Sequence, residues 1–304
     1  MTSFSATIVA YRSRDRLAAC IEPLRRMDGM QRVVVVDHGD DGSADVAEEL
    51  GALAVRNPSN PGYGAGQNAA VACTDTPYLL LLNPDAIVEP DGIATGLAFL
   101  DDNRGVAAVQ GVIRSSDTGE PERSQGVSLG PLHLLGRAVG ARRLLRVPVF
   151  HSIGRRIPGL ADHVERTPEW PSAVESLAAV SVLVRREAFD AVGGFDEDFF
   201  LYGEDIDLSK RLRLAGWTLM SLPVEWAVHA SGASSSGWWD RELVWWEGTM
   251  RAAAKWWTPR QFSMAMLAVI VRVVPMAIVR PRRASDLISR VVAAPWRARR
   301  LPRP

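Results

Sequence analysis

The sequence predicts an α/β fold whose central sheet is mostly parallel and is flanked by helices. Strand-like and helix-like segments alternate over the first 110 residues, the usual pattern of chains that build parallel sheets. Val33–Val36 is an unbroken run of valine, which is typical of a strand buried on both faces. Asp37 and Asp85 follow such runs directly, at the strand ends where open α/β sheets bind ligands.

Apolar runs define the predicted strands, and apolar residues at helical spacing define the predicted helices. The expected strands of the first part are Phe4–Ala10, Val33–Val36, Ala52–Val55 and Tyr78–Leu82. The expected helices there are Arg14–Met27, Asp45–Leu50 with Ser43 as a candidate cap, and Gln67–Cys73 after a glycine-rich loop, Asn57–Gly66.

The rest of the chain is less regular at first. Arg114–Pro171 is rich in Gly, Pro and Arg, and we expect a variable insertion or acceptor-side loop there. The segments expected beyond it are an extended run Val174–Val184, a helix Arg186–Val192, a helix Asp205–Ala215 closed by Gly216, and an extended run Leu219–Val228. We expect one domain over residues 1–235 and a Trp-rich, basic extension over 236–304.

Composition allows a sizeable core but hides a charge asymmetry. The 304 residues are 47% hydrophobic and 23% charged, which excludes a disulfide miniprotein, a collagen-like chain and wholesale disorder. The net charge is zero, yet Arg280–Pro304 holds eight arginines and one acid, so the remaining residues carry −7. Such a basic tail needs a partner or a surface to explain it.

Cysteine usage and the N-terminus predict a cytoplasmic protein. Cys20 and Cys73 are too few for a disulfide framework and are expected to be small, reduced residues of the core. Met1–Arg12 resembles a strand and lacks the basic start and long apolar run of a secretory signal.

Two carboxylates at strand ends are candidate ligand-binding groups. Asp85, in the sequence Asn83-Pro84-Asp85, could hold a divalent cation together with substrate phosphates, although the tripeptide also suits an ordinary turn. Asp37 could accept a hydrogen bond from a nucleobase or a ribose hydroxyl, or it could cap a helix or close an Asx turn.

The glycines at 62, 64 and 66 could let the backbone approach a ligand closely. Their spacing departs from the dinucleotide fingerprint, because Gln67 stands where the last glycine is required. The loop also lacks the Lys-Ser/Thr ending of a P-loop. The pattern therefore counts against a nucleotide-cofactor oxidoreductase, the second enzyme class considered.

The segment Gly193–Leu208 has the highest local density of candidate catalytic side chains in the sequence. Six carboxylates lie within residues 196–207, interleaved with three aromatic residues. Glu204 and Asp205 open a predicted helix, whose dipole favours ionised carboxylates, and an ionised carboxylate can act as a general base toward a sugar hydroxyl. A solvated acidic helix start explains the charges but not the aromatic residues.

These segments together resemble the large inverting family 2 of GT-A glycosyltransferases. The resemblance covers roughly residues 4–235 and is closest to actinobacterial rhamnosyltransferases acting on polyprenyl-diphosphate-linked sugars. It is carried by Val33–Asp37, Asn60–Asn68, Leu79–Asp85, Val182–Arg186 and Ala188–Trp217.

The resemblance implies a nucleotide-diphosphate sugar donor, Mg²⁺ or Mn²⁺ as cofactor, and a saccharide acceptor. It assigns the role of catalytic base to Asp205, with Glu204 beside it, and the role of metal ligand to Asp85. His229 is either a further metal ligand or a structural residue. The expected donor-binding residues are Ala10, Tyr11, Asp37, Gly62, Gly64, Asn68, Asn83, Gly194 and Asp196.

The implied reaction is one in-line displacement that inverts the anomeric carbon. A dTDP-sugar donor is implied by the branch resemblance alone, which implies transfer of L-rhamnose from dTDP-rhamnose. Asp37-His38-Gly39-Asp40-Asp41-Gly42 is one residue shorter than the usual family motif and has His38 for Asn, which leaves the nucleobase preference open. Another donor sugar, a soluble acceptor, or a catalytically degenerate scaffold are the alternatives.

The C-terminal extension suggests a membrane surface. Six tryptophans, at positions 238, 239, 245, 246, 256 and 257, share one helical stripe that would suit either the membrane interface or packing against the catalytic domain. Phe262–Val279 contains one charge, Arg272, and a proline, Pro275, so we expect an in-plane helix rather than a membrane span.

The arginine-rich tail is expected to meet anionic lipid, at roughly 1 kcal/mol per residue near the surface. RNA is the rival partner, but no ordered aromatic–basic module supports it, so no nucleic acid is expected. The predicted location is the inner face of the plasma membrane, with a polyprenyl-linked acceptor. A homodimer stays open.

Overall fold

The computed structural model describes residues 2–122, 130–140, 170–230 and 238–298. The chain forms two compact units. The first comprises Met1–Gly126, Thr167–Phe200 and Glu204–Ser236. The second comprises Val127–Arg166, Leu201–Gly203 and Gly237–Pro304. Each unit has its own core and is described separately.

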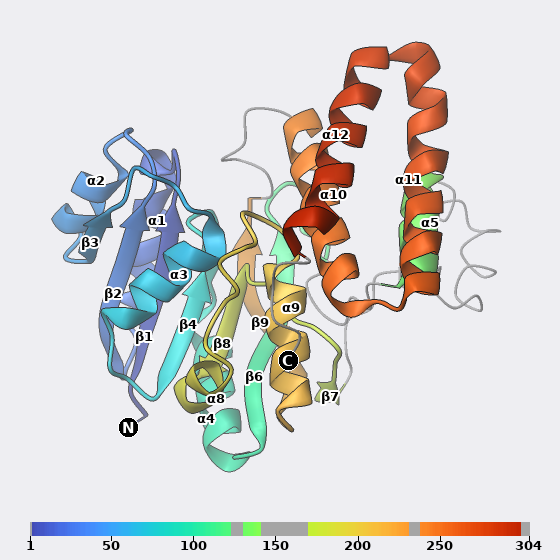
Figure 1. Ribbon diagram of the computed structural model, residues 1–304. Coiled ribbons are helices and arrows are strands. Elements are labelled where there is room, and N and C mark those ends of the chain that lie inside the picture. Colours follow the sequence, from blue (N-terminus) through green and yellow to red (C-terminus); the bar gives the residue numbers. More distant parts are fainter. Residues whose placement is uncertain (1, 123–129, 141–169, 231–237, 299–304) are drawn as a thin grey trace. The chain divides into compact units, whose positions relative to one another are not determined.

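The first unit is built on one sheet, to which nine described strands contribute (Figure 1). The strands are β1 Phe4–Ala10, β2 Met30–Asp37, β3 Leu53–Arg56, β4 Tyr78–Leu82, β5 Ala86–Val88, β6 Val106–Ser115, β7 Ser172–Ala173, β8 Ser181–Arg185 and β9 Thr218–His229. Their order across the sheet is β3-β2-β1-β4-β8-β6-β9-β5, and β7 pairs with β9.

The sheet combines a parallel half with a mixed half. β3, β2, β1 and β4 are parallel to one another, whereas β8 runs antiparallel to both β4 and β6. β9 is parallel to β6, and β5 and β7 pair antiparallel with β9. The α/β class is therefore confirmed, and the parallel character is strongest in the N-terminal half, where the strand–helix alternation predicted it.

Helices cover both faces of this sheet. Those of the first unit are α1 Arg14–Leu24, α2 Ser43–Glu49, α3 Tyr63–Ala72, α4 Pro90–Asp102, α8 Arg186–Ala191 and α9 Glu204–Leu214. Leu80 and Leu82 of β4 pack with α1 and α4, and the alternate residues Leu79 and Leu81 pack with α8 and α9. The valine run divides in the same way between two cores, so its predicted burial on both faces is confirmed.

Several predicted boundaries are wrong. α2 begins at Ser43, which is therefore inside the helix and donates to Asp41 instead of capping. α3 begins at Tyr63, so part of the predicted glycine-rich loop is helical. The extended run expected over 174–184 forms a strand only from Ser181.

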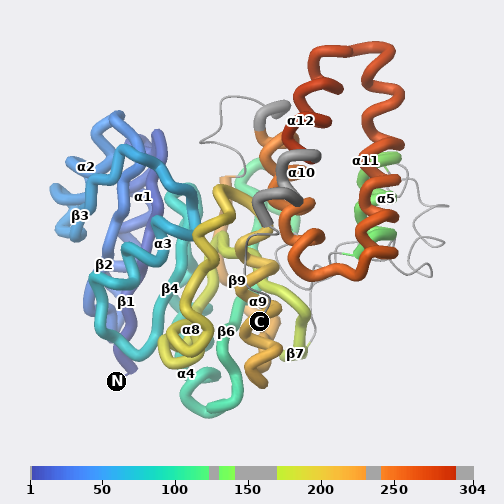
Figure 2. The backbone as a smooth tube through the Cα atoms, viewed as in Figure 1, coloured from blue at the N-terminus to red at the C-terminus, as the bar shows by residue number. Residues whose placement is uncertain are grey.

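The second unit is a helical bundle formed by α5 Pro131–Ala138, α10 Trp238–Trp256, α11 Pro259–Val279 and α12 Pro281–Ala298 (Figure 2). Its core contains the fully buried Trp246, with Trp245 and Trp257 partly buried around it. These tryptophans pack within the unit itself, so the prediction of a membrane-interface stripe is wrong for Trp246. The side chains of Trp238 and Trp239 lie outside the described part.

One buried carboxylate joins three helices of the bundle. Glu242 is 8% exposed, and its oxygens lie 3.0 Å from Arg137 and 3.5 Å from Arg272. The indole N–H of Trp246 also donates to it at 3.1 Å. Arg272, which the sequence analysis treated as an obstacle to membrane insertion, is therefore directed into the bundle.

Candidate active site

The ends of three parallel strands bring the first group of candidate residues together. Ala10 ends β1 and is the register partner of Asp37, which ends β2. β4 lies on the other side of β1, and Asn83 follows it directly. Tyr11, 40% exposed, follows Ala10 at the same edge.

Asp85 and His229 lie in contact where β5 begins and β9 ends. Asp85 Oδ1 lies 3.3 Å from Nε2 of His229, the last residue of β9, and the two side chains are 6% and 11% exposed. The other ring nitrogen, Nδ1, lies 2.8 Å from a carboxylate oxygen of Glu122. Burial lowers the pKa of His229, but the hydrogen bonds and charges of both carboxylates raise it to about 9.

The pair fits a divalent cation that receives further ligands from a substrate. Within the described residues, no three His, Cys, Asp or Glu side chains form a ready cation site by themselves. Mg²⁺ and Mn²⁺ are commonly held by one or two protein ligands together with substrate phosphates and water. Asp85 and His229 supply one oxygen and one nitrogen of that kind, and Glu122 would orient the imidazole from behind.

Asp37 acts in the structure as a turn-closing and capping residue. One carboxylate oxygen accepts from the Gly39 N–H at 2.8 Å, and the other accepts from the Ala44 N–H at the start of α2 at 2.9 Å. The side chain is buried, and burial raises its pKa. These bonds are those of the capping alternative, and a role in binding the donor stays a prediction.

The glycines after Asn60 are close-packed against the protein itself. A Cβ at Gly62, whose φ is +112°, would lie 2.4 Å from the carbonyl oxygen of Phe200. A Cβ at Gly64 would lie 2.9 Å from the Phe195 Cβ. Close packing of α3 on Phe195 and Phe200 accounts for both glycines, and a role of either one in donor binding stays a prediction.

Asn68 connects α3 to the loop that precedes the acidic cluster. Its side-chain oxygen accepts from the Phe195 N–H, and its amide donates to the Phe195 carbonyl and to Glu197. Gly194, with φ +69°, leaves room for this amide, because a Cβ there would lie 2.6 Å from Asn68 Oδ1. Asp196 closes the next turn by accepting from the Asp198 N–H. The predicted residues Asn68, Gly194 and Asp196 are thus close together.

Glu204 and Asp205 occupy the first turn of α9. Glu204 is 5% exposed, and its Oε2 has no hydrogen-bond partner among the described residues. Burial raises the pKa of Glu204 well above its usual range, and the charges of Asp205 and Asp207 raise it further. Asp205 is partly exposed, and one of its carboxylate oxygens accepts from the Ile206 N–H at 2.8 Å.

Tyr63 lies among the acidic groups of the site. Burial raises the pKa of its hydroxyl, and the charges of Glu204, Asp205 and Asp85 add to the effect. The hydroxyl donates to the Ala179 carbonyl and accepts from Gln67. These two hydrogen bonds hold Tyr63 against the segment that carries Ala179.

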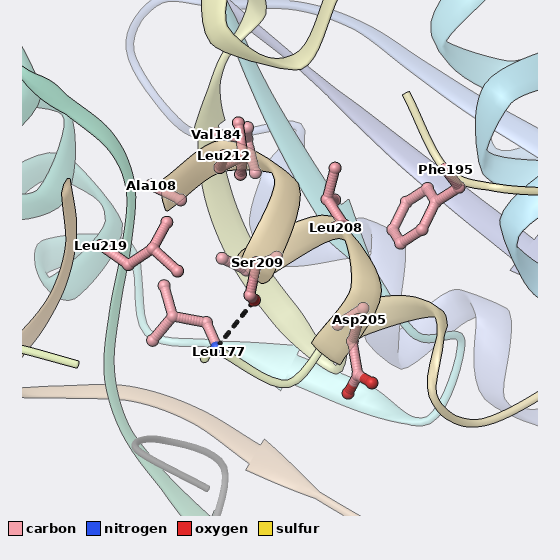
Figure 3. Close-up of a pocket in the computed structure, with 11 residues that line it drawn as sticks. Ala108, Leu177, Val184, Phe195, Asp205, Leu208, Ser209, Leu212 and Leu219 are labelled. Carbon is pink, nitrogen blue, oxygen red and sulfur yellow. Dashed lines mark hydrogen bonds between the residues drawn. The ribbon is translucent and has the colours of Figure 1, made fainter. Parts of the chain in front are cut away.

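A small pocket lies beneath α9, lined mainly by apolar side chains, with Asp205 at its edge (Figure 3). The carboxylate of Asp205 is turned away from the apolar residues in this view. The hydroxyl of Ser209 accepts a hydrogen bond from the Leu177 N–H. At about 20 Å³ the pocket could hold one water, so it is no sugar-binding site.

Two residues of the site were not predicted. Glu122 lies in a segment expected to be irregular. The pairing of Arg114 with Pro121 and the hydrogen bond from the Glu122 N–H to the Ile113 carbonyl return it to β6. Tyr63 lies in the glycine-rich segment that was expected to be a loop. Neither position carries a spacing signal, because each depends on a contact with a distant part of the chain.

Comparison with known proteins identifies the family. The model of glycosyl transferase family 2 matches residues 5–163, which is more than half of the chain. The chain belongs to glycosyl transferase family 2. A second model, described as the N-terminal domain of galactosyltransferase, matches residues 161–230, which include Glu204, Asp205 and His229.

Two family 2 relatives are rhamnosyltransferases. The chain is 25% identical to rhamnosyltransferase WbbL of Escherichia coli K12 over 247 residues, 78% of this chain and 87% of the relative. It is 36% identical over 92 residues to the N-acetylglucosaminyl-diphospho-decaprenol L-rhamnosyltransferase of Mycobacterium tuberculosis, 23% of this chain and 30% of the relative. The predicted resemblance is confirmed.

Solved structures confirm the GT-A fold. The mannosyltransferase PcManGT of Pyrobaculum calidifontis, in complex with GDP-Man and Mn²⁺, aligns with a TM-score of 0.57 at 16% identity, covering 96% of this chain and 87% of the other. GalNAc-T7 with UDP, GalNAc and Mn²⁺ aligns with a TM-score of 0.61 at 13% identity, covering 94% and 54%. Both of these neighbours were solved in complex with Mn²⁺.

Proposed function

We propose that this family 2 enzyme is an inverting, metal-dependent rhamnosyltransferase. The observation that carries the proposal is the contact of Asp85 with His229, 3.3 Å apart, in a unit whose helix α9 begins with Glu204 and Asp205. A metal–diphosphate site and a general base are the two parts that such a transfer requires.

Asp85 and His229 would hold Mg²⁺ or Mn²⁺ on the donor diphosphate, and the metal would neutralise charge on the leaving group. Asp205 would remove the proton from the acceptor hydroxyl as that oxygen attacks the anomeric carbon from the opposite face. The buried Glu204 would support Asp205 from behind. The bond to the diphosphate breaks as the new glycosidic bond forms, so the configuration inverts.

The donor-binding surface would be formed by the strand ends and the Asn68 loop. Its proposed residues are Ala10, Tyr11, Asp37, Gly62, Gly64, Asn68, Asn83, Gly194 and Asp196. We propose that the catalytic domain lies within residues 1–235, without the parts that belong to the second unit, Val127–Arg166 and Leu201–Gly203, and that residues 236–304 form an extension.

Similarity to the two rhamnosyltransferases supports L-rhamnose from a dTDP donor, and the mycobacterial relative supports a polyprenyl-diphosphate-linked acceptor. Such an acceptor is embedded in a membrane, which supports a peripheral location on its cytoplasmic face. The basic C-terminal run Arg280–Pro304 would meet anionic lipid there.

A donor panel tests this proposal. dTDP-rhamnose, UDP-, GDP- and other dTDP-sugars are incubated with the enzyme and a short polyprenyl-diphosphate-linked N-acetylglucosamine, with Mn²⁺, Mg²⁺ or chelator. We expect transfer from dTDP-rhamnose that chelator abolishes. Transfer from another donor would replace rhamnose, and full activity in chelator would overturn the metal assignment.

A further inference from the structure

An exposed apolar stripe runs along α11. Met264, Leu267, Ile270, Val274 and Ile278 are 43%, 51%, 53%, 55% and 82% exposed. Their spacing of three or four residues places them on one side of the helix. At about 1.5 Å per residue the stripe is about 21 Å long. Apolar side chains exposed in such a continuous row mark an interaction surface.

The opposite side of α11 already has its partners. Ala265, Ala268, Val269 and Val273 are buried, and α11 packs against α5 and α12 within the second unit. Arg272 belongs to this inner side, where it pairs with Glu242. The single charge within the apolar segment is therefore directed away from the stripe, and no described residue covers the stripe.

Charge at both ends of the stripe indicates what covers it. Arg260 precedes the stripe, and Arg280 and Arg282 follow it, all three exposed. No acidic residue occurs from Gly248 to Ser285. Two copies of α11, in either orientation, would bring arginine next to arginine at each end with no carboxylate to compensate. Lipid phosphates would instead pair with these arginines while acyl chains cover the stripe.

We propose that α11 lies in the plane of an anionic bilayer and inserts this stripe at the boundary between headgroups and acyl chains. The helix has the length and apolar composition of a membrane span, with a mean hydropathy of 2.3 over 18 residues, but only one side of it is available to lipid. In-plane insertion keeps the Arg272–Glu242 pair inside the bundle. The stripe, rather than the arginine tail alone, is thus the attachment surface.

Vesicle binding of the full chain tests this. The wild-type protein is compared with Ile270→Glu/Val274→Glu by co-sedimentation with vesicles of phosphatidylcholine containing phosphatidylglycerol, and with phosphatidylcholine alone. We expect at least a tenfold loss of partitioning onto the anionic vesicles for the double variant. The wild type should bind neutral vesicles more weakly than anionic ones.

The matched control is Leu53→Glu/Leu214→Glu, two residues of the first unit with 43% and 66% exposure. It should bind vesicles as the wild type does, and circular dichroism melting should show that all variants remain folded. Unchanged vesicle binding by Ile270→Glu/Val274→Glu, or no binding by the wild type, would overturn the proposal. A wild-type dimer that the double variant converts to monomer, without any lipid binding, would assign the stripe to a second copy instead. None of these outcomes depends on sugar transfer.

Discussion

At the scale of single residues, the site is defined by what surrounds each carboxylate. Asp205 lies at the N-terminus of α9, where the helix dipole favours its ionised form. Glu204, one residue earlier, is buried and has a raised pKa. The two adjacent acids thus differ in exposure, since Glu204 is buried and Asp205 is partly exposed.

Replacing Asp205 by Asn should remove the catalytic base and leave the size and shape of the side chain nearly unchanged. We expect transfer to fall by about 10³-fold or more, with donor affinity within about threefold of wild type, because Asn cannot accept the acceptor's proton. Initial rates and calorimetric titration with donor measure the two effects. The control is Asp198→Asn, an exposed acid of the same segment, and equal losses in both variants would argue against the base role.

Replacing Glu122 by Gln should weaken metal binding, because the carboxylate no longer fixes the imidazole of His229. We expect Mn²⁺ affinity in the presence of nucleoside diphosphate to fall about tenfold or more, as measured by electron paramagnetic resonance. Glu120→Gln, in the same turn, should leave the affinity unchanged. Wild-type affinity in Glu122→Gln would show that Asp85 alone orients the histidine.

Replacing Glu204 by Gln should change how stability depends on pH. The folded protein retains the Glu204 proton at pH values where the unfolded chain, with a pKa of about 4.3, has lost it. Wild-type stability therefore falls as the pH rises from that value toward the raised pKa, and the variant lacks this fall. Urea denaturation should show the variant more stable than wild type at pH 8 and equal to it near pH 4. A constant difference at both pH values would contradict the assignment.

Residue type and order predicted much of this site, but not the contacts. Asp85 and His229 were predicted as metal ligands, and the structure places them side by side. Their roles stay predictions until tested. Glu122 could not be predicted, because it reaches His229 from 107 positions away in the sequence through an irregular segment. Gly62 and Gly64 were predicted to let a ligand approach the backbone. The sequence does not show that Phe195 and Phe200 fill the space beside them.

At the scale of elements, strands were easier to predict than helices. Buried strands are recognisable in a sequence as apolar runs, and β1, β2 and β4 contain the predicted runs. α4 gives a poor helix signal because it contains Gly92 and Gly96, yet a Cβ at Gly96 would lie 2.6 Å from the Trp226 ring. The space that this indole needs, rather than local preference, explains the glycine there.

Among the helices of the second unit, Glu242 should be the most sensitive position. Glu242→Gln leaves Arg137 and Arg272 without their shared charge, and we expect the unfolding free energy of this unit to fall by about 2 kcal/mol. Glu247→Gln breaks the more exposed pair with Arg290 and should cost less than about 1 kcal/mol. Thermal and urea denaturation measure both. Equal losses of unfolding free energy in the two variants would mean that the burial of Glu242 does not strengthen its ion pairs.

At the scale of the whole molecule, the two units have separate cores, and one proposed site lies in each. The strand-end site belongs to the first unit, and the α11 stripe belongs to the second. The basic run that begins at Arg280 lies in the second unit. The boundary itself depends on long-range packing, which charge alone does not specify.

We therefore expect two unfolding transitions in calorimetry. Nucleoside diphosphate with Mn²⁺ should stabilise only the first unit. At a ligand concentration of one hundred times the dissociation constant, its unfolding free energy should rise by about 2.7 kcal/mol and its melting temperature should rise with it. Glu242→Gln should lower only the other transition. One cooperative transition that shifts as a whole with ligand would contradict separate units.

The segment Leu201–Gly203 gives the two units a covalent connection at a sensitive place. It belongs to the second unit, where Gly248 of α10 packs so closely on Tyr202 that even a methyl group at position 248 would not fit. The next residue along the chain is Glu204, and Asp205 follows. The chain therefore passes from the second unit into the first immediately before the proposed base, and Asp205 is separated by only two residues from a backbone that α10 holds in place.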